Sequence, residues 1–190
     1  MSFTRALRCL PPLVALLGLA LAPAPVLALD STSSVVFEDQ RYAQRLQITG
    51  IPACPDLLDT LYDMQTMRRL TPFVDTIEML DERPDAHVVR VGFSILGFYT
   101  RLVYERLLFR DDGRIELRLL SHESTFPLVQ FPADFLATYR VSPDGDGARV
   151  DYAQDATMQR SASLPHQLVV RAQVAGFERR LERVLQEACP

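Results

Sequence analysis

The sequence predicts an α+β fold in which a curved antiparallel sheet of about seven strands grips a long C-terminal helix, with two short helices after the first strand. Three observations lead to this prediction. Stretches of alternating apolar and polar residues are joined by hairpin-type turns such as Asp111-Asp112-Gly113. Apolar residues within 57–70 recur at helical spacing. One uninterrupted apolar stripe runs along residues 165–188, as expected for an amphipathic helix that covers a sheet.

The N-terminal part of the fold combines one strand with two helices. We expect the first strand over Val35–Ile48, after a polar lead-in at Ser31–Ser34 and with a bend near Glu38-Asp39. Asp56 opens the first helix, where the helix dipole favours an acidic residue. A second short helix is expected over Gln65–Leu70, because a proline follows closely and stops it.

Six further strands follow in the middle of the chain. They are expected at 76–81, 87–95, 99–110, 114–121, 134–141 and 148–158, with an irregular segment at 123–132. The alternation is clearest where Val89, Val91 and Phe93 share one face. Gly92 and Gly97 lack a side chain and help such a sheet to bend.

The C-terminal helix is the clearest element. Its apolar residues step by three or four positions through Val170, Val174, Phe177, Leu181, Val184 and Ala188. Ser163 is placed to cap its start, and Pro165 suits the first turn. A curved sheet with one long helix across it leaves a space between the two layers.

Residues 1–28 have the layout of a cleavable signal peptide. Arg5 and Arg8 precede an apolar run, and small residues lead to a cleavage position after Ala28. The apolar run is too short to cross a bilayer comfortably, although an uncleaved anchor is the alternative. We therefore expect a single domain over 29–190, located in the bacterial periplasm or secreted.

The composition excludes several classes of function. The 190-residue chain contains no Lys, which excludes a Schiff-base lysine and a P-loop lysine. Its formal net charge of −4 argues against a nucleic-acid partner held through the phosphate backbone. The sequence carries none of the common motifs of serine hydrolases, zinc proteases, thiol oxidoreductases or dinucleotide-binding proteins. We expect no cofactor and no metal.

Two cysteines, Cys54 and Cys189, remain after removal of the signal peptide. In an oxidising compartment a lone pair often forms one disulfide. Two free buried thiols are the alternative that the sequence leaves open.

Four stretches share the pattern of a known superfamily. They are Ile48–Asp63 (strand, small-residue turn and first helix), Pro72–Glu78, Phe135–Arg140 followed by a Pro-Asp-Gly turn and Val150-Asp151-Tyr152, and Leu164-Pro165 at the start of the last helix. Together with the order of elements, they resemble the SRPBCC superfamily, the helix-grip fold of START lipid-transfer domains and polyketide cyclases. The resemblance covers nearly all of residues 34–188. It implies that Cys54 and Cys189 lie close together, and hence a disulfide between them.

The resemblance also implies a ligand cavity between the sheet and the long helix. The candidate lining is an apolar set with a few polar groups, as is usual for small-molecule sites: Phe93, Ile95, Leu102, Tyr104, Leu117, Leu119, Phe135, Tyr139, Tyr152, His166, Val170, Val174 and Phe177. The three tyrosines would supply polar groups inside it. Periodicity alone does not distinguish such a cavity from a filled core.

Ionisable residues were weighed as parts of a site. His87 follows a charged turn and is expected to be solvated, whereas His122 and His166 could be cavity acids or bases or could have structural roles. Arg101 or Arg140 could hold an anionic head group if either pointed inward. Outward cross-strand ion pairs are the favoured interpretation for both arginines.

These observations favour a periplasmic protein that binds or transfers a hydrophobic small molecule or lipid and is not an enzyme. One alternative is an enzyme of the cyclase, dehydratase or hydrolase kind acting on a hydrophobic substrate. It would use acid–base groups among His122, His166, Glu123 and Tyr104. Another alternative is a module that binds a periplasmic protein partner. After signal cleavage we expect no stable membrane span.

Overall fold

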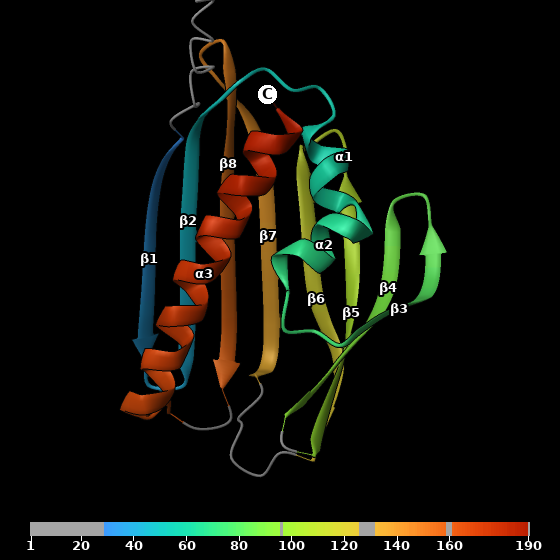
Figure 1. Ribbon diagram of the computed structural model, residues 1–190, viewed down its shortest axis with the longest axis vertical. Helices are drawn as coiled ribbons and strands as arrows, with labels where there is room; N and C mark the ends of the chain where they lie inside the picture. Colours follow the sequence, from blue (N-terminus) through green and yellow to red (C-terminus); the bar gives the residue numbers. More distant parts are fainter. Residues whose placement is uncertain (1–28, 96, 126–131, 159–160, 190) are drawn as a thin grey trace, which may run out of the picture.

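The computed structural model describes residues 29–95, 97–125, 132–158 and 161–189. Its elements are β1 (Asp30–Glu38), β2 (Arg41–Ile51), α1 (Leu57–Tyr62), α2 (Met64–Leu70), β3 (Thr76–Arg83), β4 (Ala86–Ile95), β5 (Phe98–Phe109), β6 (Arg114–Ser124), β7 (Pro132–Asp144), β8 (Gly147–Met158) and α3 (Leu164–Ala188). The strands form one antiparallel sheet in the order β1-β2-β8-β7-β6-β5-β4-β3. Figure 1 shows α3 crossing β1, β2 and β8 on the face of the sheet that also carries α1 and α2.

The sheet has eight strands, one more than predicted, because the segment expected as one bent strand over Val35–Ile48 is a hairpin. Glu38 pairs with Arg41 across a two-residue turn. Asp39 in that turn adopts a left-handed backbone conformation with a φ of 50°, which Asp tolerates better than most residues. The lead-in at Ser31–Ser34 is part of β1. Its polar character reflects an edge strand whose outer side faces solvent.

The remaining strands lie where the alternation predicts them, with ends that differ by a few residues. The turns at Asp111–Gly113 and Asp144–Gly147 join antiparallel neighbours, as expected. Gly113 has a φ of 59°, and a Cβ at this position would lie 2.5 Å from the backbone oxygen of Val141. A glycine is therefore required where this turn approaches β7.

Asp63 is the one residue between the two short helices α1 and α2. The carboxylate of Asp63 accepts hydrogen bonds from the backbone amides of Gln65 (2.7 Å) and Thr66 (3.1 Å), so it caps the start of α2. At the start of α3, Ser163 occupies the capping position, but its side chain makes no capping hydrogen bond. The predicted Ser163 cap is therefore absent.

Polar contacts from β1 and α2 hold α3 on the sheet. The hydroxyls of Ser31 and Ser33 donate to the carboxylate of Glu178 at 2.9 and 3.0 Å. The Nε of Arg180 donates to the backbone oxygen of Leu70 at 3.0 Å. Along the described parts of the chain, none of the helices combines the length and the apolar character needed to cross a membrane.

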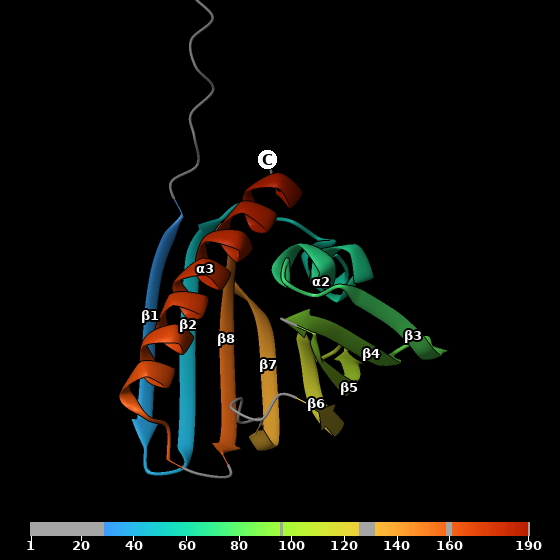
Figure 2. The same cartoon turned by 60° about the horizontal axis from the view of Figure 1, so that its bottom comes forward.

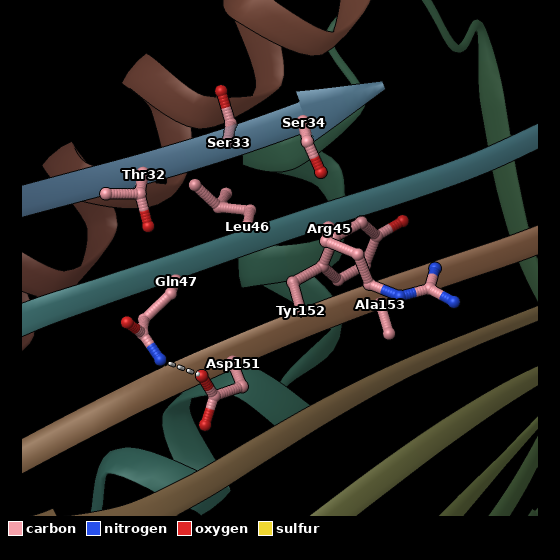
Figure 3. A pocket seen from close by; sticks show the side chains of 9 residues that line it. All are labelled: Thr32, Ser33, Ser34, Arg45, Leu46, Gln47, Asp151, Tyr152 and Ala153. Atoms are coloured by element: carbon pink, nitrogen blue, oxygen red, sulfur yellow. Dashed lines mark hydrogen bonds between the residues drawn. The ribbon is translucent and has the colours of Figure 1, made fainter. Parts of the chain in front are cut away.

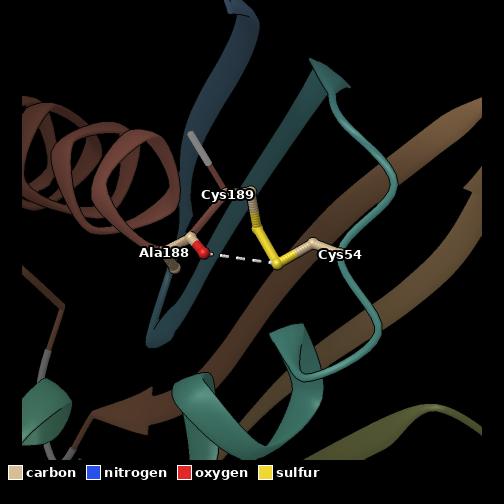
Figure 4. The surroundings of a disulfide bond; sticks show 3 residues. All are labelled: Cys54, Ala188 and Cys189. Carbon is tan, nitrogen blue, oxygen red and sulfur yellow. Dashed lines mark hydrogen bonds between the residues drawn. A yellow bond between two sulfur atoms is a disulfide. The ribbon is translucent and has the colours of Figure 1, made fainter.

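A disulfide joins Cys54, in the connection from β2 to α1, to Cys189 at the end of α3, with Cα atoms 5.6 Å apart (Figure 4). The pairing that the helix-grip resemblance implies is therefore present. Cys189 is buried in the main apolar core, and Cys54 packs against that core. The bond fixes the C-terminal end of the long helix to the beginning of the short-helix pair.

Candidate ligand-binding face

The strand pairings place the predicted strand residues of the ligand set on one face of the sheet. In these pairings Tyr152 stands beside Tyr139, Leu117 beside Ala137, Tyr104 beside Leu119, and Phe135 beside Ala156. The members of the set on this inner face, which α3 covers in part, are Phe93, Leu102, Tyr104, Leu117, Leu119, Phe135, Tyr139 and Tyr152. Ile95 occupies the same register on β4, but its side chain lies outside the described part of the structure.

One end of the inner face is closed. We call this the closed end, which comprises Ile48, Ile115, Val150, Leu181 and Leu185, each fully buried. Leu57 and Leu61 of α1 join this cluster, and the disulfide adjoins it. Side chains from α3, α1 and the strands pack closely here, as in the core of any globular protein. We therefore look for a ligand site at the other end of this face.

The other end of the inner face is only half-covered. We call it the open end, which comprises Phe93, Leu102, Leu119 and Phe135, all large apolar side chains and all half-buried. Figure 2 shows why: α3 lies over β1, β2 and β8, while α1 and α2 lie at the opposite end of β4–β7. None of the three described helices covers the lower part of these strands in that view.

The N-terminal half of α3 lies over β1 and β2 (Figure 1) and is little buried. The predicted stripe is correct, since Val174, Leu181 and Val184 are buried. Burial nevertheless falls toward the start of the helix, where His166 and Val170 are only half-buried. Three apolar residues outside the predicted stripe are largely exposed there: Leu164 (69%), Leu168 (60%) and Val169 (59%).

Aromatic rings cross the inner face from α3 to the open end. The ring of Phe177 lies 4.7 Å from that of Tyr152, which lies 4.8 Å from that of Tyr139. Tyr104 meets Phe135 edge-on at 5.5 Å. Phe177 therefore belongs to the same face as the strand residues of the set.

The tyrosines of this face remain neutral hydrogen-bonding groups. Burial raises the pKa of Tyr104, Tyr139 and Tyr152 above the usual range of a phenol. The hydroxyl of Tyr152 donates to the Oε1 of Gln154 at 2.6 Å. At neutral pH each phenol can donate a hydrogen bond, whereas none is prepared to act as a base.

Two of the four acid–base candidates lie in very different surroundings. Tyr104 is on the inner face, whereas the side chain of Glu123 is 59% exposed and accepts a hydrogen bond from Tyr99 at 2.7 Å. His122 is exposed at the end of β6, and His166 is half-buried at the start of α3. In the described ranges, no three His, Cys, Asp or Glu side chains gather closely enough to hold a metal ion.

His87 is less solvated than predicted, because the residue is half-buried. Its ring stacks on that of Tyr62 with centroids 4.5 Å apart, beneath the short helices. Its Nδ1 is buried, and none of the described residues forms a hydrogen bond with it. Burial and the nearby Arg106 guanidinium lower the pKa of His87, so the ring is neutral near pH 7.

The outward interpretation of Arg101 and Arg140 is correct, and a different arginine lies inside. Arg101 is 58% exposed, with its Nη1 3.7 Å from Glu123, and Arg140 is also exposed. Arg106 is only 2% exposed and lies under α1 and α2. This inward position was not predicted, although Arg106 follows Leu102 and Tyr104 at the two-residue spacing of one strand face.

A shallow hollow of about 380 Å³ lies elsewhere, over β1, β2 and β8 (Figure 3). Its lining residues include Thr32, Ser34, Arg45 and Gln47, together with the apolar parts of Leu46 and Tyr152. The amide of Gln47 donates to the carboxylate of Asp151 at 2.9 Å. The hollow is open to solvent, whereas a site for a hydrophobic ligand is expected to enclose most of it.

Comparison with known proteins places the fold among solved structures. No family model matches the chain, and no curated protein matches it either. A STAR-related lipid transfer protein from Xanthomonas axonopodis superimposes with a TM-score of 0.56 at 20% identity, over 83% of this chain and 93% of its own.

Two further structures agree. The Zhui aromatase/cyclase from Streptomyces sp. R1128 gives a TM-score of 0.55 at 17% identity, over 85% of this chain and 94% of its own. A START superfamily protein from Mycobacterium smegmatis gives 0.51 at 12% identity, over 85% and 96%. At these identities the likeness establishes architecture. The chain therefore has a START-like helix-grip fold.

Proposed function

We propose that this protein binds or transfers a hydrophobic small molecule or lipid between the sheet and α3. The observation that supports this most directly is the open end, where Phe93, Leu102, Leu119 and Phe135 gather on one face and stay half-buried. Burial of apolar area yields roughly 25 cal/mol per Å². A protein without a ligand or partner would gain stability by covering these side chains.

The remaining predicted residues extend this face into a complete lining. Leu117, Tyr104, Tyr139 and Tyr152 continue it across the sheet. From α3 we propose that His166, Val170, Val174 and Phe177 complete the lining, and the ring of Phe177 already packs on that of Tyr152. An apolar wall with a few buried hydroxyls suits a ligand that is mostly hydrocarbon with one or two polar groups.

The comparisons support the same class of ligand. One similar structure is a STAR-related lipid transfer protein and another is an aromatase/cyclase. Tyr104 and Glu123, two of the acid–base candidates, lie in opposite environments in this chain. We therefore propose a carrier in preference to a cyclase.

Native mass spectrometry of the chain exported to a bacterial periplasm tests the proposal. We expect a reproducible adduct that is lost on denaturation and that solvent extraction identifies as a hydrophobic compound. Leu119→Arg, on the inner face, should remove the adduct. Leu120→Arg should keep it, because Leu120 is the neighbouring residue and is 54% exposed. An adduct retained by both variants, or a wild-type protein free of any adduct, would contradict a ligand at this face.

We also propose that the protein is exported and cleaved after Ala28. The disulfide between Cys54 and Cys189 supports an oxidising compartment. N-terminal sequencing of the periplasmic fraction should begin at Leu29. A chain that keeps residues 1–28 in the membrane fraction would instead indicate an uncleaved anchor.

A further inference from the structure

Arg106 is a buried cation without a carboxylate partner. Its Nη1 lies 3.1 Å from the sulfur of Met64, and its Nη2 donates a long hydrogen bond of 3.4 Å to the backbone oxygen of Leu61. Its Cζ lies 4.9 Å from the centre of the Tyr62 ring. Among the described residues, none accepts a hydrogen bond from its Nε, and no acidic side chain forms an ion pair with it. A guanidinium stays charged even where burial disfavours the charge.

The groups around Arg106 do not neutralise it. His87 is its neighbour across β4 and β5 and is neutral near pH 7, with its buried Nδ1 unpaired among the described residues. Tyr139 is buried close to Arg106. Burial raises the pKa of Tyr139, and the positive charge of Arg106 partly opposes that rise. The nearest acidic influence comes from Asp63, which is exposed and caps α2 through its carboxylate. An unpaired buried charge is strongly destabilising, so the site lacks one negative charge.

Arg106 also stands at the boundary of the two ends of the inner face. On the same face of β5, the next residue toward the closed end is Leu108, which is 5% exposed. The next residues toward the open end are Tyr104 and Leu102, both half-buried. The distance along the strand from Arg106 to Thr100 is roughly 20 Å. One acyl chain, at about half the 30 Å hydrocarbon thickness of a bilayer, fits within it.

We infer that Arg106 binds the carboxylate of an amphiphilic ligand whose hydrocarbon part lies along the open end. This inference rests on the proposed function and narrows its ligand class. The planar guanidinium can offer its free Nε–H, together with an Nη group released from its weak contacts, to the two oxygens of one carboxylate. The hydroxyl of Tyr139 is a second donor on the same side. One positive charge matches one carboxylate.

Calorimetric titration with decanoate and with decanol tests this inference, because the two probes differ in the head group alone. The wild-type chain should bind decanoate at least 10-fold more tightly than decanol. Arg106→Leu should weaken decanoate binding at least 10-fold and change decanol binding less than about threefold, as expected for loss of a charge-assisted hydrogen bond. Arg101→Leu is the matched control on the same strand. It should leave both affinities unchanged because Arg101 is 58% exposed.

Failure of the inference differs from failure of the proposed function. Equal binding of decanoate and decanol, insensitive to Arg106→Leu, would overturn the carboxylate site and leave a hydrophobic carrier. Absence of binding for both probes would overturn the carrier and the inference together. Binding of dioctanoyl phosphatidylglycerol that depends on Arg106, without binding of decanoate, would assign the cation to a phosphodiester and overturn the carboxylate.

A second variant keeps the test decisive if Arg106→Leu does not fold. Tyr139→Phe removes one buried hydroxyl and keeps the ring that packs on Tyr152. It should weaken decanoate binding about 3- to 10-fold, the range of one hydrogen bond, with decanol affected less. Unchanged decanoate binding in this variant would remove Tyr139 from the site, and with it the second donor on which the inference depends.

Discussion

The two ends of the inner face use similar residues for different purposes. At the closed end Ile115, Leu181 and Leu185 are fully buried, and the disulfide joins two of the surrounding elements. At the open end Leu102, Leu119 and Phe135 are just as apolar and yet half-buried. Residue type therefore does not separate core from site here. What separates them is the path of α3, whose C-terminal half packs against α1 and α2 while its N-terminal half does not.

On the proposed function, the difference in burial gives the closed end the role of stabilising the fold and the open end the role of binding the ligand. Close packing and the disulfide make the closed end the part of the inner face that contributes most to folding stability. Local opening costs least where few apolar contacts are made, and the start of α3 has exposed Leu164, Leu168 and Val169. On the proposed function, a ligand would therefore enter at the open end while the closed end keeps the fold intact.

Of the changes considered, removal of the disulfide at the closed end should lower the free energy of unfolding most. The bond links residues 135 positions apart, and the chain-entropy model assigns about 4–5 kcal/mol to such a loop. Cys54→Ala combined with Cys189→Ala should lower the free energy of unfolding in urea by about that amount. Wild-type protein in reductant should show the same loss, and the double variant should not respond to reductant. Equal urea midpoints for the oxidised wild type and the double variant would show that the closed end is stable without the bond.

Replacing one leucine at each end of α3 compares how much packing there contributes to stability. Leu181 is fully buried, so Leu181→Ala should lower the free energy of unfolding by about 3 kcal/mol. Leu168 is 60% exposed, so Leu168→Ala should change it by less than about 0.5 kcal/mol. Urea unfolding measures both. A loss of more than about 1.5 kcal/mol for Leu168→Ala would mean that the start of α3 is packed as firmly as its end.

Much of this architecture could be predicted from the sequence, because alternation and the apolar stripe are local signals. The β1–β2 hairpin was missed, because its turn at Asp39-Gln40 has no glycine and lies within a run of polar residues. A left-handed Asp in a two-residue turn resembles a bend when only residue types are considered.

The site was predictable only in part, for a physical reason. Alternation shows which residues share a face, and it placed Leu102, Tyr104 and Leu119 together correctly. It does not show which part of that face a helix covers, because packing between distant segments decides this. His87 was predicted to be solvated and Arg106 was not considered, yet both lie beneath the short helices.

Replacement of Arg106, the buried cation, tests whether this residue belongs to the closed end or to the proposed ligand site. In the absence of ligand, Arg106→Met should raise the free energy of unfolding by about 1 kcal/mol, because an uncompensated buried charge gives way to an apolar chain of similar length. Arg101→Met, at an exposed position of the same strand, should change it by less than about 0.5 kcal/mol. Urea unfolding of ligand-free protein measures both. A large loss of stability in Arg106→Met would show that Arg106 holds α1 and α2 in place and would assign it to the closed end.

The smallest effect is a pH dependence at the same boundary. Burial, with a contribution from Arg106, lowers the pKa of His87 in the folded state below the 6.5 of the unfolded chain. Below that pH the unfolded chain takes up a proton first, so the stability due to neutral His87 is complete above pH 6.5 and is lost as the pH falls toward the folded-state pKa. His87→Phe keeps a ring against Tyr62 and should lose less stability than the wild type between pH 7 and pH 5. His122→Gln, at an exposed position, should follow the wild type. Parallel curves of unfolding free energy against pH for the wild type and His87→Phe would mean that the ring can gain a proton without leaving its place under the short helices.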